Sequence, residues 1–389
     1  MTAQSARVRS GPLCDLRVVE FEGVGPAPFC GMLLSDLGAD VIRIDRSSAG
    51  DLVGADIPAR FNTLGRGRRS VAFDLKRQDA VTACLKLVDQ ADLLIEGFRP
   101  GVMERLGLGP DVCSARNPKL VYGRVTGWGQ YGPNALRAGH DLNYIALSGA
   151  LHAIGTQQQP VPPLNLVGDF GGGALYLAFG VLAALIHARR TGLGQVVDCA
   201  MSDGAASLMG SIYAVNAAGQ WLDRRQENLI DGGAHFYGVY RCADDKWVSV
   251  AALERRFYAE LVLRTGLDDP DLEAHEDRSR WPGMRLKLAA IIASKTQPEW
   301  CRLMHGADAC FAPVLDLSSA PLDPHNAARQ AFIDVEGVVQ PAPAPRFEMT
   351  PGQVQGPPPE RGQHSRETLN DWGLSAGEID RLIDSGACR

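Results

Sequence analysis

The sequence predicts an α/β fold in which a large domain with a parallel sheet is joined to a smaller α+β domain. Between residues 16 and 125, short β-rich runs alternate with helical segments, which is the pattern of βαβ units. The middle of the chain changes to long apolar helices and then to a hairpin. A length of 389 residues with 45% hydrophobic content allows two or three domains with a large core.

The expected parallel sheet begins with β-rich runs at residues 16–21, 41–44, 71–73, 92–96 and 120–125. Helices are expected between them at 29–37, where Gly38 provides the stop signal, and at 80–90. Because parallel strands need crossover connections, helices placed between strands favour a parallel sheet.

Two apolar helices are expected next, at 171–191 and 202–222. Residues 237–242 and 246–251 flank an Ala-Asp-Asp turn and predict a hairpin. The remaining expected elements are helices at 257–265, 284–294 and 298–306, a proline-rich extended segment at 341–359, and a helix at 375–384 with a Ser cap and a Glu three residues on.

These elements define the expected domain ranges. The large domain takes 1–200, linker helices take 201–230, the small domain takes 231–325, and 326–389 returns to the large domain.

The composition disfavours several classes of protein. A net charge of -6 is unlike a general nucleic-acid binder or a membrane-surface protein, which are usually basic. The nine cysteines form no C-x-x-C pair, which indicates reduced thiols and a cytoplasmic location. The longest apolar run, 174–186, is too short to span a bilayer and predicts a buried helix instead.

A partial glycine motif follows the first expected strand. Gly23 and Gly25 precede a helix, and Asp45 ends the next strand, as in a dinucleotide-binding fingerprint. Pro28 occupies the position of the third glycine, which that motif needs for close packing of helix and strand. A plain turn between strand and helix is therefore favoured over a nucleotide site.

Basic residues are concentrated in one segment of this acidic chain, namely Arg43, Arg46, Arg60, Arg66, Arg68, Arg69, Lys76 and Arg77. Their place near strand ends suits a phosphate-rich ligand, because open α/β sheets bind ligands there and arginine forks match phosphate oxygens. The alternative is a solvated basic face.

Two candidates for proton transfer stand in glycine-rich, apolar settings. His140 lies in the run GHDLNY (139–144), and Asp169 lies in GDFGGG (168–173). An imidazole and a carboxylate facing one carbon could remove a proton from one side and return it to the other, which is racemase chemistry. Each residue also has a structural explanation, as a loop histidine for His140 and as a helix N-cap for Asp169.

The chain resembles the class III CoA-transferase (CaiB/BaiF) family over nearly its whole length. The resemblance rests on the runs VVEF (18–21), LGADVIRIDR (37–46), FDLK (73–76), EGFRPG (96–101), GLGQVVD (192–198) and MSDG (201–204). Within the family, the runs around His140 and Asp169 are similar to those of the α-methylacyl-CoA racemase branch. The transferase branch shares the aspartate, which it uses as a nucleophile, but typically lacks the histidine.

The resemblance implies an interlocked homodimer, in which a Rossmann-like large domain is made from both ends of each chain. It further implies that the active site lies where the large domain of one chain meets the small domain of the other. His140 would be the base for the S substrate and Asp169 the base for the R substrate. Glu254, from the small domain of the partner chain, would pair with His140 and fix its tautomer.

The resemblance also implies where the substrate binds. The N–H groups of 169–171 would point at the thioester oxygen, with the helix dipole adding positive potential. Contacts to CoA carried over by position are Arg46, Phe73, Asp74, Leu75, Lys76, Gly97, Phe98, Arg99, Arg105, Gly139, Asp141, Leu142, Asn143 and Tyr144. No cofactor is expected beyond the CoA moiety of the substrate.

Three functions are compatible with these residues. The first is racemisation of 2-methylacyl-CoA, the second is CoA transfer with Asp169 as nucleophile, and the third is acyl-CoA binding without catalysis. Nothing in the sequence specifies the acyl chain.

Overall fold

The computed structural model describes residues 9–48 and 57–389, and it divides the chain into two compact units. The first unit comprises Met1–Ser148, Leu164–Leu208 and Gln330–Arg389, and the second comprises Gly149–Pro163 and Met209–Arg329. Relative to the ranges expected from the sequence, 149–163 lies in the second unit and 201–208 lies in the first.

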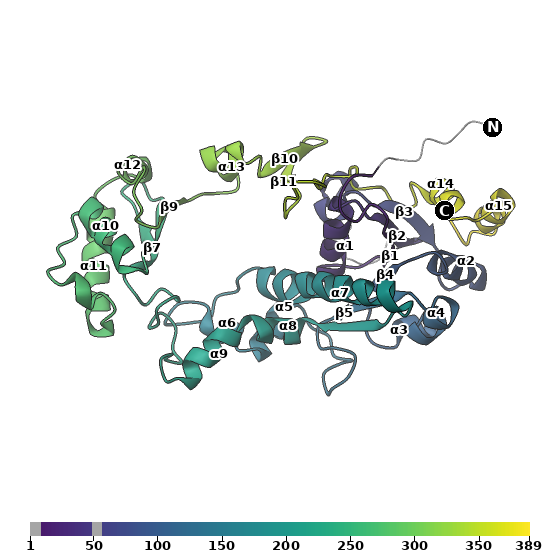
Figure 1. Ribbon diagram of the computed structural model, residues 1–389, viewed down its shortest axis with the longest axis horizontal. Coiled ribbons are helices and arrows are strands. Elements are labelled where there is room, and N and C mark those ends of the chain that lie inside the picture. The colour runs from purple at the N-terminus through teal and green to yellow at the C-terminus, as the bar shows by residue number, and fades with distance from the viewer. Residues whose placement is uncertain (1–8, 49–56) are drawn as a thin grey trace. The chain divides into compact units, whose positions relative to one another are not determined.

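A six-stranded parallel sheet forms the centre of the first unit (Figure 1). Its strands are β1 (Arg17–Phe21), β2 (Asp40–Arg46), β3 (Arg69–Phe73), β4 (Leu93–Glu96), β5 (Val121–Thr126) and β6 (Val196–Ala200). The order is β3-β2-β1-β4-β5-β6, so the direction of winding reverses between β1 and β4. The expected α/β fold with a parallel sheet is confirmed, and the reversal marks the place where such sheets bind ligands.

Side chains alternate between the two faces of this sheet, as the pleat of a strand requires. On β1, Val18 joins a core with helices α1 (Pro26–Asp36) and α7 (Tyr176–Thr191), whereas Val19 joins a core with α2 (Gln78–Val88) and the C-terminal helices. Both faces are therefore buried, which explains why these strands read as continuous apolar runs.

The other helices of the first unit are short. They are α3 (Val102–Arg105), α4 (Pro110–Arg116), α5 (Asp141–Leu147), α8 (Met201–Leu208), α14 (Ser365–Asp371) and α15 (Ala376–Asp384). Helix α1 begins three residues earlier than expected, because Pro26 suits the first position of a helix. The expected cap of α15 is confirmed, since Glu378 accepts hydrogen bonds from the backbone N–H and the hydroxyl of Ser375.

The long apolar helix is longer than the sequence predicted. A π-helix, Leu166–Leu175, runs directly into α7 and gives 26 residues that are apolar and long enough to cross a membrane by length and composition. The expectation of a run too short to span was wrong, because the π-helix adds the glycine-rich segment. The expected burial holds for one face only, since Phe179 and Ile186 are 76% and 62% exposed.

The π-helix packs against α8 at backbone distance. A Cβ on Gly172 would lie 2.6 Å from the backbone nitrogen of Ala205, and one on Gly204 would overlap the carbonyl of Gly172. Glycine at both positions therefore allows the contact. The single helix expected at 202–222 was wrong, because the chain forms α8 and then α9 (Gly210–Ala217), which belong to different units.

The second unit is a smaller α+β unit with a three-stranded antiparallel sheet, ordered β7-β8-β9. Its elements are α6 (Ala150–Ala153), α9, β7 (Tyr237–Arg241), β8 (Trp247–Ala251), α10 (Arg255–Thr265), α11 (Trp281–Ile292), α12 (Gln297–Leu303), β9 (Phe311–Val314) and α13 (Pro324–Ala328). The predicted hairpin is β7 with β8, and β9 is a strand that the sequence reading missed.

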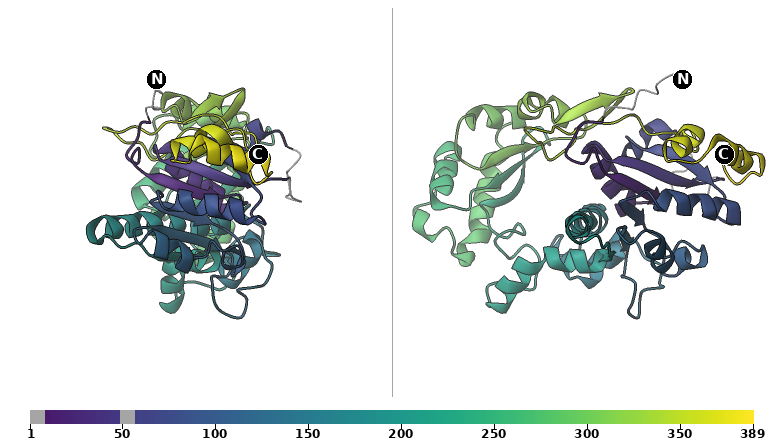
Figure 2. Two further views of the ribbon diagram at one scale, coloured as in Figure 1. Left: turned by 90° about the vertical axis from the view of Figure 1, so that its right-hand side faces the viewer. Right: turned by 45° about the vertical axis from the view of Figure 1, so that its right-hand side comes forward.

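After Arg329 the chain returns to the first unit. It forms the hairpin of β10 (Phe332–Val335) and β11 (Val338–Pro341), and then an extended proline-rich segment as predicted. Helices α14 and α15, drawn in yellow in Figure 2, lie beside β3 and α2. The backbone N–H of Arg389 donates to the carbonyl of Ala72, and that of Asp74 donates to the carbonyl of Ala387.

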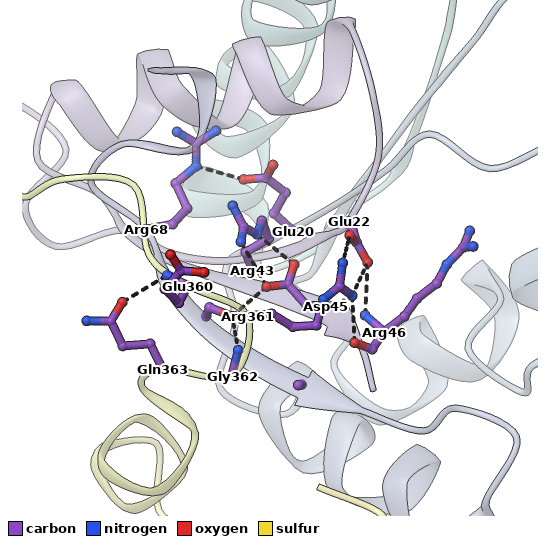
Figure 3. Close-up of polar contacts among 12 residues, drawn as sticks. Glu20, Glu22, Arg43, Asp45, Arg46, Arg68, Glu360, Arg361, Gly362 and Gln363 are labelled. Carbon is purple, nitrogen blue, oxygen red and sulfur yellow. Dashed lines mark hydrogen bonds and ion pairs between the residues drawn. The ribbon is translucent and has the colours of Figure 1, made fainter. Parts of the chain in front are cut away.

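Buried ion pairs hold this part of the chain together (Figure 3). Arg68 and Glu20 form a pair with both side chains fully buried, and Arg43 pairs with Asp45. Arg361, from the returning segment, pairs with Glu22 at the end of β1. Arg68 also donates to the carbonyls of Pro28 and Arg66, so one guanidinium ties β1, α1 and the segment before β3.

Replacing Arg68 by Met should lower the free energy of unfolding by about 3–5 kcal/mol, because Glu20 would be left buried without its partner. Urea denaturation measures the change. The matched control is Arg116→Met, whose pair with Asp89 is exposed and should cost only about 0–1 kcal/mol. Equal losses in the two variants would contradict this assignment.

Candidate active site

The residues expected to contact CoA gather at the carboxyl edge of the parallel sheet. Arg46 ends β2 and Phe73 ends β3, while 74–76 follow β3, 97–99 follow β4, and 139–144 come after β5. Because the strands are parallel, their carboxyl ends meet at one edge. At the reversal of the winding, a Cβ on Gly97 would lie 3.5 Å from Ala27 Cβ, so the turn after β4 touches the first turn of α1.

Asp169 lies at this reversal, beside the turn between β1 and α1. A Cβ on Gly25 would stand 2.9 Å from Asp169 Oδ2, so glycine leaves the room that the carboxylate occupies. Asn165 Nδ2 donates to Asp169 Oδ2 at 3.2 Å. Burial raises the pKa of Asp169, while the Asn165 hydrogen bond and the charge of His140 lower it and the charge of Asp141 raises it. The net shift is upward, which moves this carboxyl toward the range useful for proton transfer at neutral pH.

His140 is the residue immediately before α5, and its side chain is exposed. Its backbone N–H donates to Asn143 Oδ1 at 3.0 Å, which fixes the entry into the helix. The backbone N–H of Asp169 donates to Oδ1 of Asp141, the residue that follows His140, at 2.7 Å. The structure therefore brings the two proton-transfer candidates to the same edge of the same unit.

Tyr144 supports the loop that carries His140. Its hydroxyl donates to the carbonyl of Gly139, and its ring meets Trp128 edge-on at 4.8 Å between centroids. Burial raises the pKa of Tyr144 to about 12, so the phenol stays protonated and donating. Tyr144, which the resemblance predicted to contact CoA, is therefore buried, and its side chain holds the loop that carries His140.

Asp169 is not the N-cap that the sequence suggested. The helical segment starts at Leu166, with Asn165 before it. The N–H of Asp169 donates to Asp141 Oδ1 at 2.7 Å, and the N–H of Phe170 donates to the carbonyl of Asn165 at 3.3 Å. Both groups are occupied, so the expectation that the N–H groups of 169–171 receive the thioester oxygen was wrong for these two.

The basic segment divides into two groups. Arg66, Arg68 and Arg69 are buried and Arg43 is half-buried, and all four are paired with carboxylates, which corrects the expectation that the whole segment forms a phosphate handle. Arg77 is exposed and pairs with Asp79, and Arg60 is exposed without an ion-pair partner among the described residues. Arg46 and Lys76 of the segment, together with Arg99 and Arg105 after β4, are likewise exposed without an ion-pair partner there. They are the side chains of this edge that are free to meet phosphates.

The other predicted CoA contacts differ in exposure. Gly97, Leu142 and Asn143 are exposed, whereas Asp74, Leu75, Phe98 and Gly139 are half-buried. Phe73 and Asp141 are buried, at 1% and 7% exposure. The buried pair can therefore reach a ligand only through backbone atoms or by movement.

The dinucleotide alternative is disfavoured by two contacts. Asp45, the candidate for a ribose hydroxyl, is buried between Arg43 and the hydroxyl of Ser70. The space above Gly25 is taken by the carboxylate of Asp169.

Glu254 belongs to the second unit, where it is the exposed residue before α10. Its carboxylate has no hydrogen-bond or ion-pair partner in 9–48 and 57–389. Two other groups at the site were missed from sequence, namely Asn165 and the stack of Phe29 on Phe170 at 4.5 Å. The available signal was the position of Asn165, four residues before Asp169 and directly before the helical segment.

Comparisons with known proteins agree with the resemblance noted in the sequence. The model of CoA-transferase family III matches residues 13–365. Alpha-methylacyl-CoA racemases of Mus musculus and Homo sapiens are 43% and 40% identical, over 96% of this chain and 98% of each relative. The beta subunit of a succinyl-CoA–L-malate CoA-transferase of Chloroflexus aurantiacus is 30% identical over 95% of this chain and 96% of that protein.

Solved structures show the same architecture. The protein Rv3272 of Mycobacterium tuberculosis superimposes with a TM-score of 0.76 at 29% identity, over 92% of this chain and 98% of that one. A CaiB/BaiF family protein of Brucella suis gives 0.77 at 24% identity, over 94% of this chain and 100% of that one, and supports the fold alone.

The raised pKa of Asp169 predicts how stability depends on pH. Folding disfavours the ionised carboxylate of Asp169, so the pKa in the folded state lies above the ordinary value of 3.8. The free energy of unfolding of wild type should therefore be highest below pH 3.8 and should fall as the pH rises through the raised pKa. Asp169→Asn stays neutral, so it should be more stable than wild type at pH 7.5, and the difference should shrink toward pH 3.5. Urea denaturation at both pH values tests this, and a difference that does not vary with pH would contradict it.

Proposed function

The chain belongs to CoA-transferase family III, and we propose that it interconverts (R)- and (S)-2-methylacyl-CoA thioesters by proton transfer through an enolate. The observation that carries the proposal is that Asp169 is hydrogen-bonded to Asp141, the residue next to His140, in a chain 40–43% identical to alpha-methylacyl-CoA racemases. The enzyme is thus an isomerase.

The reaction needs only one proton removed and one returned. With the S substrate, neutral His140 takes the α-proton, and the electron pair moves onto the thioester oxygen to form the enolate. Protonated Asp169 then delivers a proton to the opposite face, and the R substrate reverses these roles. The raised pKa of Asp169 favours this use, because burial disfavours its charged form and keeps the acid available.

Glu254 is proposed to orient the imidazole of His140, with the carboxylate supplied by a second copy of the chain. Its support is that Glu254 is exposed and unpaired among the described residues. A carboxylate on one ring nitrogen fixes the histidine tautomer and raises its basicity.

The CoA moiety of the substrate is proposed to be the only cofactor-like group required. Its phosphates are proposed to bind Arg46, Lys76, Arg99 and Arg105, which are exposed, while the paired arginines remain structural. Loops at 73–76, 97–99 and 139–144 would surround the rest of CoA.

A homodimer is proposed, with the exposed side of the Leu166–Thr191 helical segment in its interface. Leu175, Phe179 and Ile186 are 50%, 76% and 62% exposed, while Leu177, Val181 and Leu185 on the other side pack into the core of the first unit. Large exposed apolar surfaces mark interaction sites. We also propose a cytoplasmic location, in keeping with nine unpaired cysteines and a net charge of -6, without nucleic-acid or membrane partners.

Deuterium exchange tests the reaction. Wild type should incorporate deuterium at the α-carbon of a chiral 2-methylacyl-CoA in heavy water, followed by NMR. His140→Ala and Asp169→Ala should each lose about 10²–10⁴-fold in rate, because each removes one proton-transfer group. His305→Ala and Asp111→Asn, which replace exposed residues elsewhere, are the matched controls.

Two other outcomes point to the alternatives. Absence of exchange together with a hydroxylamine-trapped acyl adduct on Asp169 would favour CoA transfer, as in the relatives named CoA-transferases. CoA binding that survives both substitutions, without exchange in wild type, would indicate a binding protein.

Phe179→Glu should convert the dimer to a monomer, because it buries a charge in the proposed apolar interface. Light scattering coupled to size exclusion measures the mass. Leu263→Glu, at a similarly exposed leucine (73%) on α10, is the control and should leave the mass unchanged. A Phe179→Glu protein that keeps the wild-type mass would contradict the interface. Co-sedimentation of the wild-type protein with lipid vesicles would indicate a lipid-facing helix instead.

A further inference from the structure

Asp141 stands next to the proposed base His140 and touches the backbone of the proposed acid Asp169. We propose that its side chain is a positioning residue, which holds Asp169 in place relative to His140, and that it does not contact CoA. This inference rests on the proposed racemase function and deepens it by one residue.

The contact is direct and spans distant parts of the chain. Asp141 Oδ1 accepts the N–H of Asp169 at 2.7 Å, although the two residues are 28 positions apart. Asp141 is the first residue of α5 and follows His140 directly. One peptide bond and one hydrogen bond therefore connect the two proton-transfer residues.

The π-helix explains why Asp169 needs this acceptor. In the first turn of a helix the N–H groups have no partner within the helix, and wider π-turns leave more of them free. Phe170 donates to the carbonyl of Asn165, five residues back, which is the π pattern. The N–H of Asp169 lies one residue before the first π-helical hydrogen bond, so it has no acceptor within the helix, and Asp141 accepts it instead.

The space around the carboxylate admits little variation. A Cβ on Gly168 would lie 2.5 Å from Asp141 Oδ1 and 3.1 Å from Ile145 Cγ2. The second oxygen, Oδ2, is buried with no hydrogen-bond partner in the described residues, and Asp141 as a whole is 7% exposed. A buried carboxylate with an unpaired oxygen is costly for folding alone, so a task at the site accounts for it.

Two substitutions separate positioning from ligand contact. Asp141→Asn keeps the acceptor oxygen at the same reach, and it should retain kcat for α-deuterium exchange within about threefold. Asp141→Glu keeps the charge but lengthens the side chain in a space closed by Gly168 and Ile145. It should lower kcat about 10²-fold, the order expected when a reacting group is misplaced by 1 Å, with KM for the acyl-CoA nearly unchanged.

The opposite pattern would overturn the proposal. If Asp141→Glu keeps kcat while Asp141→Asn raises KM, the charge of Asp141 contacts the ligand. A kcat loss in Asp141→Asn as large as that in Asp141→Glu would also overturn the proposal, because the asparagine variant keeps the acceptor oxygen in place. The control is Asp111→Ala, which removes an acid from the first turn of α4, outside the site. Far-UV circular dichroism establishes folding of each variant.

Gly168, which lies against the carboxylate of Asp141, allows a second test of the contact between Asp141 and Asp169. Gly168→Ala should displace the Asp141 carboxylate and lower kcat, and the Gly168→Ala/Asp141→Glu double variant should lose less than the sum of the single effects. Additive losses would show that the two residues act separately. Wild type without exchange would instead defeat the proposed function, whatever the variants do.

Discussion

The turn between β1 and α1 is the constraint on which the site depends. Its glycine, Gly25, leaves the room in which the carboxylate of Asp169 stands, and Pro26 starts the helix that packs beside the π-helix. Arg68 fixes this turn from behind, because its guanidinium bonds both Glu20 on β1 and the carbonyl of Pro28 in α1. The fully buried ion pair of Arg68 and Glu20 thus holds the turn against which the carboxylate of Asp169 lies.

Charge is divided at this edge according to burial. Arginines under the loops are neutralised by carboxylates, and an ion pair without solvent holds its geometry because breaking it is costly. Cations at the loop ends remain exposed and free to bind phosphates. One stretch of basic sequence therefore contains two kinds of arginine, and only burial separates them.

The parallel strands and the first helices could be predicted because both faces of the sheet are buried and their residues are apolar. Strand β6 was not, because its first residues are exposed and its partner β5 lies some 70 positions away in sequence. The π-helix depends on a backbone contact between Gly172 and Gly204, which no local pattern encodes. His140 and Asp169 were found by residue type and family resemblance, whereas the support from Asp141 and Asn165 required coordinates.

The segment that returns to the first unit delays the completion of the parallel sheet during folding. Residues 387–389 pair with the backbone beside β3, and Arg361 closes the ion pair with Glu22. During synthesis, the edge of the sheet formed from residues 69–73 must wait for partners made more than 280 residues later, while the second unit is already complete. The proposed CoA-binding loop after β3 therefore gains its backbone partners only when residues 387–389 have been made and have folded back, later than the second unit.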